Sequence, residues 1–219
     1  MNNYIVFDLE WNQSPEGKGN SIENLPFEII EIGAVKLDSH LQLISEFHRL
    51  IAPQVYTQLH YIISEVTHMN IQELKKKGEP FGEVIRDFLE WCGNDYWLCT
   101  WGSMDLTELQ RNMDFYHVEI PFEHPLLYYD VQKLYSLTRK NSKEKLSLDH
   151  AVEELQIKQD RPFHRALDDA YYTGNVLQHM EMSLWEPYFS MDYYWVPHTK
   201  QDEITLRFPT YLKYVSRTF

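Results

Sequence analysis

The sequence predicts an α/β fold in which a mixed sheet is flanked by helices. Residues 4–10 form an apolar run that becomes acidic only at its end, as expected of a central strand covered on both faces. Residues 27–37 and 44–51 have the pattern of two further strands, joined as a hairpin by the turn at residues 38–40. Helices and strands then alternate along the chain. This order favours a sheet with helices packed against it.

The later segments extend this pattern. At residues 81–92 apolar side chains recur at helical spacing, whereas residues 96–101 have the apolar character of a buried strand. Ser147 is suited to cap a helix that begins after it. Further helices are predicted at residues 105–116, 130–137, 147–155 and 165–184.

The composition changes after residue 184. Residues 185–219 are crowded with aromatic side chains and contain three prolines, so we expect residues 1–184 to form one domain and residues 185–219 to form a C-terminal extension. So many aromatic side chains left in water would create an apolar patch of a kind that monomers avoid. The extension is therefore expected to pack on the domain, on a second copy in a homodimer, or on a protein partner.

The overall charge argues against a broad polyanion-binding surface. The chain carries 33 acidic and 20 basic side chains, a formal net charge of −13. This charge repels nucleic acids over most of the surface, and it permits only a binding site whose affinity is local. Cys92 and Cys99 have no metal-ligand spacing. No secretory signal and no apolar run of membrane-spanning length is present, so we expect a cytoplasmic protein with no membrane contact.

The end of the first strand carries two carboxylates. Asp8 and Glu10 lie two residues apart, so they share one face of the strand. Neighbouring carboxylates repel each other unless a cation lies between them, and Mg²⁺ and Mn²⁺ prefer oxygen ligands. The alternative interpretation is an acidic strand end exposed to solvent.

A third acidic residue follows another strand. The predicted strand at residues 96–101 stops at Gly102, and a helix begins at Asp105. Ligands of open α/β sheets bind beyond the carboxyl ends of the strands. Taken alone, Asp105 is better explained as an acid that stabilises the helix N-terminus. Its proximity to other carboxylates would make it a metal ligand.

The last segment places a histidine before two aspartates. His164 lies at the start of a predicted helix that carries Asp168 and Asp169. A histidine of ordinary pKa can accept a proton from an attacking water, although a lone histidine is more often a surface or capping residue. On a helix of about 100° per residue, Asp169 falls about 60° from the centre of the apolar stripe and Asp168 about 160° from it. We therefore expect Asp169 to be the ligand, at the border of the core.

These segments together resemble the three motifs of the DnaQ-like DEDDh exonucleases. The motif residues are Phe7-Asp8-Leu9-Glu10, then Glu28 to Val35, Asp105, and His164 through Asp169. The resemblance runs from about residue 4 to residue 184, and within the family the chain is most similar to the branch of histone-mRNA exonucleases and KapD-like proteins. Each motif is weak alone, but their joint order is specific.

The resemblance implies an RNase H-like fold and a 3′-to-5′ exonuclease in residues 1–184. It also implies two Mg²⁺ or Mn²⁺ ions, held about 3.5 to 4 Å apart around the scissile phosphate, and release of nucleoside 5′-monophosphates from the 3′ ends of RNA or single-stranded DNA. The predicted metal ligands are Asp8, Glu10, Asp105 and Asp169. His164 is the predicted general base.

The predicted substrate-binding residues lie near the first motif and in a second segment. They are Leu9, Trp11, His68 and Met69. Residues 65–69 are similar to the family segment beside the terminal nucleotide. Trp11 and Met69 are candidates for stacking on bases, and core packing is the alternative for both. The basic stretch at residues 139–145 is a candidate for phosphate contacts, or else a solvated loop.

Two other classes of function remain open at this stage. A binding or regulatory module could keep the fold without catalysis, although such a module has no need of four converging acids. A metal-dependent phosphatase acting on small monoesters is disfavoured by the order of the motifs. The sequence does not distinguish RNA from DNA as substrate.

Overall fold

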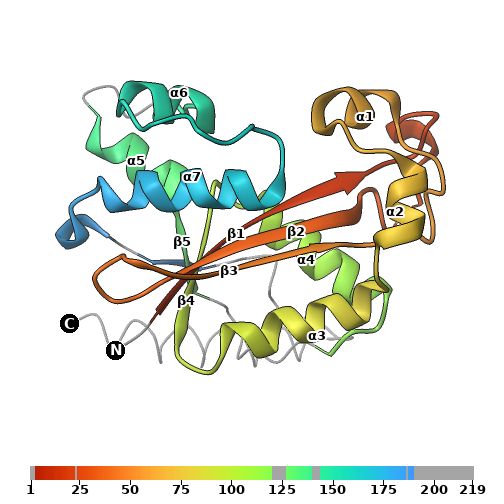
Figure 1. Ribbon diagram of the computed structural model, residues 1–219, viewed down its shortest axis with the longest axis horizontal. Coiled ribbons are helices and arrows are strands. Elements are labelled where there is room, and N and C mark those ends of the chain that lie inside the picture. The colour runs from red at the N-terminus through yellow and green to blue at the C-terminus, as the bar shows by residue number, and fades with distance from the viewer. Residues whose placement is uncertain (1–2, 23, 120–126, 140–143, 186, 190–219) are drawn as a thin grey trace, which may run out of the picture.

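The computed structural model describes residues 3–22, 24–119, 127–139, 144–185 and 187–189 of the chain. A six-stranded sheet in the order β3-β2-β1-β4-β5-β6 forms its centre (Figure 1). Strands β1 and β4, and β4 and β5, pair in parallel, whereas β2, β3 and β6 join in antiparallel fashion. The strands are β1 (Asn3–Asn12), β2 (Glu28–Leu37), β3 (Leu43–Leu50), β4 (Tyr96–Thr100), β5 (Leu127–Asp130) and β6 (Tyr188–Phe189). The predicted mixed sheet is confirmed.

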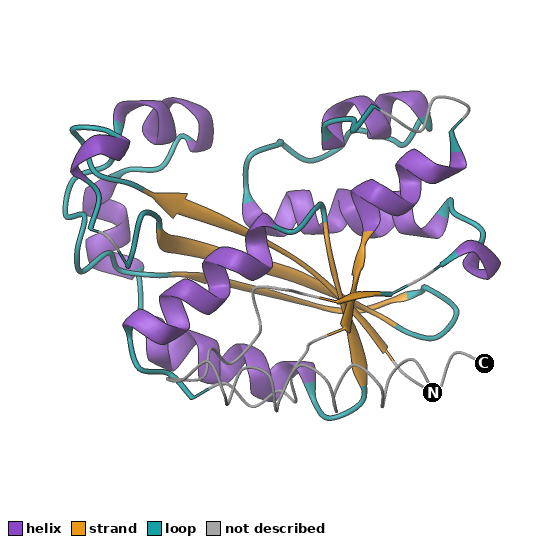
Figure 2. Cartoon of the chain, turned by 180° about the vertical axis from the view of Figure 1, so that it is seen from behind, coloured by secondary structure: helices purple, strands orange, loops and turns teal. Residues whose placement is uncertain are grey.

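Helices cover both faces of the sheet, and a pair of short helices lies beyond one end of β1 (Figures 1 and 2). Helices α3 and α4 pack on one face, and α5, α6 and α7 pack on the other. The helices are α1 (Tyr61–Thr67), α2 (Ile71–Lys77), α3 (Phe81–Cys92), α4 (Met104–Phe115), α5 (Val131–Thr138), α6 (Leu148–Glu154) and α7 (Ala166–Gln178). In the described part of the chain, no helix has the length and apolar character needed to cross a bilayer.

The alternation of β1 assigns its residues to the two faces. Ile5, Phe7 and Leu9 pack in the core beneath α3 and α4, whereas Tyr4 and Val6 pack in the core beneath α5, α6 and α7. Side chains two apart share a face of a strand. The next two positions of the second set, residues 8 and 10, therefore lie on the face that α7 covers.

One predicted helix is too long. Residues 165–184 were expected to form a single helix, but α7 ends at Gln178. The N–H groups of His179 and Met180 donate to carbonyls only three residues back, which closes the helix, and a 3₁₀ turn (Met182–Leu184) follows. Met180 is still buried against the same core. The apolar spacing therefore continues after the helical backbone has ended.

Short elements were missed by the sequence pattern. Helices α1 and α2 were not predicted, and neither was β5, part of which was assigned to a helix at residues 130–137. That helix begins at Val131, because the side chain of Asp130 caps it by accepting the N–H of Lys133.

Most of the aromatic extension lies outside the described residues, so its predicted packing and the domain boundary at residue 184 stay predictions. The first residue of the extension, Trp185, packs against the domain. Trp185 makes edge contacts with Tyr4 and Tyr129, at ring-centroid distances of 5.3 and 5.5 Å. Strand β6 then pairs with β5.

Candidate active site

The register of β1 and β2 places acidic side chains on the α7 face of the sheet. Asp8 lies opposite Gly33, and Glu10 lies opposite Glu31. Directly opposed residues of an antiparallel pair project to the same face. This face therefore carries three carboxylates and, beside Asp8, one position without a side chain.

The position without a side chain admits the start of α7. A Cβ atom on Gly33 would lie 2.0 Å from the backbone nitrogen of Leu167 and 2.3 Å from the carbonyl carbon of Ala166. Neither contact is possible for a real side chain. Only glycine lets the first turn of α7 lie directly on β2, and this close approach brings Asp169 to the carboxylates of β1.

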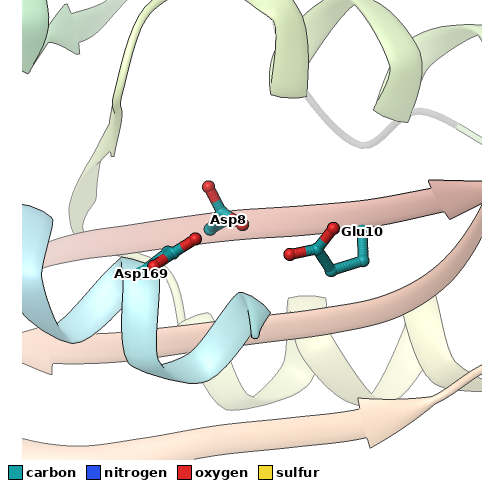
Figure 3. A group of neighbouring side chains, drawn as sticks. All are labelled: Asp8, Glu10 and Asp169. Carbon is teal, nitrogen blue, oxygen red and sulfur yellow. The ribbon is translucent and has the colours of Figure 1, made fainter. Parts of the chain in front are cut away.

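Asp8, Glu10 and Asp169 turn their carboxyl groups toward one another (Figure 3). Each offers an oxygen atom, and these atoms all lie within 4.8 Å of one another. Asp105 is not part of this close group, but its Oδ1 accepts the backbone N–H of Leu9 at 3.2 Å. The start of α4 thus carries the fourth predicted carboxylate to the neighbourhood of Asp8.

The carboxylates disfavour one another's ionised form. Burial, followed by the charges of Asp105 and Asp169, raises the pKa of Asp8 well above its ordinary range. Burial and the charge of Asp169 raise the pKa of Glu10 to about 8. Burial is also the main reason that the pKa values of Asp105 and Asp169 are raised to about 7. A group of carboxyls with raised pKa values is stabilised as carboxylates by a bound cation.

The two aspartates of α7 have different surroundings. Asp169 Oδ2 accepts the backbone N–H of His164 at 3.1 Å, and its buried Oδ1 has no hydrogen-bond partner among the described residues. Asp168 instead lies 3.6 Å from the guanidinium of Arg161. The structure therefore brings Asp169, and not Asp168, into the carboxylate group.

His164 lies outside α7, on the turn that leads into it. Its side chain is exposed, and its backbone has a left-handed conformation with φ of 66°. Two hydrogen bonds hold the preceding loop on the helix, because the hydroxyl of Tyr172 accepts the N–H of Arg161 and donates to its carbonyl, both at 2.8 Å. Phe163 stacks on Tyr172 at 4.7 Å.

The four predicted substrate-binding residues are in different environments. Leu9 is buried in the core beneath α3 and α4. Trp11 is partly buried and packs beside Phe27, with ring centroids 5.8 Å apart. Met69 is buried in a small cluster with Ile30 and other apolar side chains, as the core-packing alternative expects.

His68 ends α1 and has a left-handed backbone with φ of 55°. Its side chain is exposed. A surface pocket of about 590 Å³ lies alongside, lined in part by Tyr61, Glu65 and Met69. His68 is thus exposed to solvent, and the mostly buried Met69 contributes to the lining of the pocket.

Glu28 and Asn12 anchor the segment before α1. Both side chains are buried. The carboxylate of Glu28 accepts the backbone N–H groups of residues 54, 55 and 56 and the hydroxyl of Tyr116. The amide of Asn12 donates to the carbonyls of Tyr56 and Gln58 and accepts the N–H of His60. These bonds tie α1 to the strand that carries Asp8 and Glu10.

Three residues beside the carboxylates had no role predicted from the sequence: Glu31, His48 and Arg165. Glu31 is fully buried, and it is hydrogen-bonded by His48 and by Arg165. Burial alone would raise the pKa of Glu31, but these hydrogen bonds outweigh it and lower the pKa. A signal was present in the sequence, because Glu31 is an acid within an otherwise apolar strand at residues 29–35.

Comparison with protein families identifies the chain. The exonuclease family of RNase T matches residues 5–177. The chain belongs to this family, the RNase T/DnaQ-like DEDD exonucleases, which hydrolyse phosphodiester bonds. The family and the RNase H-like fold predicted from the motifs are thereby confirmed. A search of curated protein sequences finds no match.

Several solved structures with the same fold are nucleases. The nuclease domain of 3′hExo, a DEDDh family member bound to rAMP, has a TM-score of 0.72 and 19% identity, over 87% of this chain and 98% of that domain. Cell-death related nuclease 4 has a TM-score of 0.68 and 16% identity, over 81% of this chain and 63% of its own. E. coli exonuclease I in complex with a dT13 oligonucleotide has a TM-score of 0.63 and 16% identity, and this chain spans 40% of it.

Proposed function

We propose that the protein is a metal-dependent 3′-to-5′ exonuclease that removes nucleoside 5′-monophosphates from the 3′ ends of RNA or single-stranded DNA. One observation carries the proposal. Asp8, Glu10 and Asp169 converge to within 4.8 Å on the sheet face that α7 covers, in a chain of the exonuclease family. The overall charge of −13 leaves local ion-mediated contacts as the means of holding a polyanion.

The donor set fits hard divalent cations. All the candidate ligands are carboxylate oxygens, which Mg²⁺ and Mn²⁺ prefer. The buried Oδ1 of Asp169 lacks a protein partner among the described residues, so it is available to a ligand. Asp8, Glu10, Asp105 and Asp169 would hold two ions. When bound, the ions neutralise charge on the phosphate and lower the pKa of bound water.

The chain itself contributes proton transfer and orientation. His164 is exposed on the turn beside the carboxylates, and its imidazole would accept a proton from the attacking water as the general base. The backbone hydrogen bond from His164 to Asp169 keeps this residue next to the carboxylate group. Attack on the terminal phosphodiester breaks the bond between its phosphorus and the 3′ oxygen of the shortened strand. The phosphate therefore stays attached to the 5′ oxygen of the released nucleotide.

Substrate contacts would come from both sides of the carboxylates. Trp11 follows Glu10 on β1 and is only partly buried, and His68 is exposed at the end of α1, so both can contact a nucleotide. Leu9 and Met69 would support these contacts from the core. Within the described part of the basic stretch, Lys145 is exposed and would contact a phosphate, whereas Arg139 is paired with Glu154.

A degradation panel tests the proposal. Single- and double-stranded RNA and DNA of matched sequence, labelled at the 5′ end, are incubated with the protein and Mg²⁺ or Mn²⁺. We expect ladders that shorten from the 3′ end, nucleoside 5′-monophosphates as products, and no reaction in excess chelator. Asp8→Asn serves as the control, because it should fold and remain inactive. Intact binding of Mn²⁺ without hydrolysis of any substrate would favour the non-catalytic module instead.

A further inference from the structure

Glu31 is a buried carboxylate that the mechanism above does not use. Its side chain is fully buried, and it faces the same side of the sheet as Glu10, which lies opposite it in the register. Within the described residues, the group whose oxygens converge closely enough to hold a metal does not include Glu31. The role of Glu31 therefore follows from the hydrogen bonds that its side chain makes.

Both oxygens of Glu31 are occupied by donors from two other elements. Oε1 accepts Nη2 of Arg165 at 2.6 Å and Nε at 3.1 Å, and it lies 2.6 Å from Nε2 of His48 on β3. Oε2 accepts Nε of Arg165 at 3.2 Å and the backbone N–H of Ala166 at 3.2 Å. These contacts use the acceptor capacity of a carboxylate, so Glu31 is suited to fixing protein groups rather than an ion.

The fixed groups lie between the two functional residues of this segment. Arg165 directly follows His164, and Ala166 is the first residue of α7. Asp169 is on the helix, whose position is set by buried Ala166 and Ala170. His164 is on the exposed turn outside the helix, which Phe163 holds on the N-terminal side by stacking on Tyr172, and its backbone N–H donates to Asp169. The contact of Arg165 with Glu31 holds the same turn from its C-terminal side.

We propose that Glu31 is a positioning residue, which acts through Arg165 to hold the His164 turn beside the metal carboxylates. The inference rests on the proposed function, in which His164 is the general base. An ion pair that only stabilises the fold would affect catalysis whether or not His164 is present. A positioning role for Glu31 predicts a loss of catalysis only when His164 is present. Substitution of a residue that orients a functional group in this way typically lowers activity about ten- to a hundredfold.

A double-mutant cycle tests this dependence. The proteins are wild type, Glu31→Gln, His164→Ala and the double variant, assayed at steady state on a 5′-labelled oligonucleotide at saturating Mn²⁺. Glutamine keeps the shape of Glu31, but it presents an NH₂ group to donors that need an acceptor. We expect Glu31→Gln to lower kcat about ten- to a hundredfold with little change in KM. In the His164→Ala background the same change should cost less than about twofold, because coupled residues are non-additive.

Two further measurements separate positioning from general damage. Calorimetric titration should give the same Mn²⁺ affinity for Glu31→Gln as for wild type. Arg165→Lys, at a partly exposed side chain, keeps the charge but loses the two-nitrogen contact, so it should repeat the pattern if Glu31→Gln does not fold. Glu79→Gln removes a carboxylate from an exposed pair with Arg49 and should keep wild-type kcat.

Each outcome decides between the alternatives. An equal loss of kcat from Glu31→Gln with and without His164 would overturn the positioning role, and so would a marked loss of Mn²⁺ affinity. Full activity of the His164→Ala variant would have a different meaning, because it would remove the general base from the proposed function. A loss that is confined to the background containing His164 supports the inference.

Discussion

Replacing Gly33 by alanine should push the start of α7 away from β2 and so move Asp169 away from the carboxylates of β1. The added Cβ would lie 2.0 Å from the backbone nitrogen of Leu167, about 1.4 Å short of the 3.4 Å at which ordinary contact begins. The colliding atom is backbone, so the first turn of α7 must move by roughly 1 Å. Overpacking of this kind costs about 1–3 kcal/mol of stability. A misplacement of about 1 Å can cost about a hundredfold in rate, and Asp169 moves with the helix.

Two measurements test this prediction. We expect Gly33→Ala to remain folded at low temperature, to melt several degrees below wild type, and to lose about a hundredfold in single-turnover rate at saturating Mn²⁺. The control is Gly82→Ala on α3, where a Cβ would meet only the side chain of Val118 at 3.5 Å. That change should preserve activity and raise stability slightly, because alanine is a better helix former. Wild-type melting and rate in Gly33→Ala would refute the close-approach argument.

The remaining predictions concern the ligands, the metal-free state and the extension. Asp169→Asn should lose nearly all activity at saturating Mg²⁺ and Asp168→Asn should keep most of it; the reverse ranking would misplace the last ligand. In the folded protein the pKa values of Asp105 and Asp169 are raised from 3.8 to about 7. In the metal-free protein, the contribution of these two groups to the free energy of unfolding should therefore be complete below about pH 4. It should then fall by a few kcal/mol as the pH rises through about 7, and Mn²⁺ should reverse the loss; flat denaturant midpoints from pH 5 to 8 in chelator would contradict this. Truncation after residue 184 removes the ring contacts of Trp185 and should lower the melting temperature, and light scattering would show any accompanying change in mass. An unchanged melt and mass would count against packing of the extension.

The sheet could be predicted because its signals are local. The apolar patterns of β1, β2 and β3 and the helical spacing of α3 each fall within one element of at most twelve residues, and all were predicted at nearly their observed bounds. Helices α1 and α2 have seven residues each, too few for an apolar periodicity to develop. The end of α7 was misplaced because burial of Met180 continues the helical spacing beyond the helix.

The carboxylates of the candidate site could be predicted from local patterns in the same way. The contacts that hold these carboxylates in place could not. The spacing of Asp8 and Glu10 and the helical phase of Asp169 follow from the periods of a strand and a helix. The contact between Glu31 and Arg165 joins residues 134 apart in the chain. It depends on the register of β2 against β1 and on the approach of α7, and the single sequence gives no direct signal of either.

The core and the carboxylate group are consequences of one register. The alternation that places Ile5, Phe7 and Leu9 in the core beneath α3 and α4 also places Asp8 and Glu10 on the face of α7. A slip of one residue would exchange these two sets and bury carboxylates against apolar helices. The unfavourable burial of charge in that alternative is several kcal/mol per ion, which for two carboxylates is comparable to the whole stability of a small domain. The hydrophobic pattern of β1 therefore determines where the carboxylates of the proposed metal site lie.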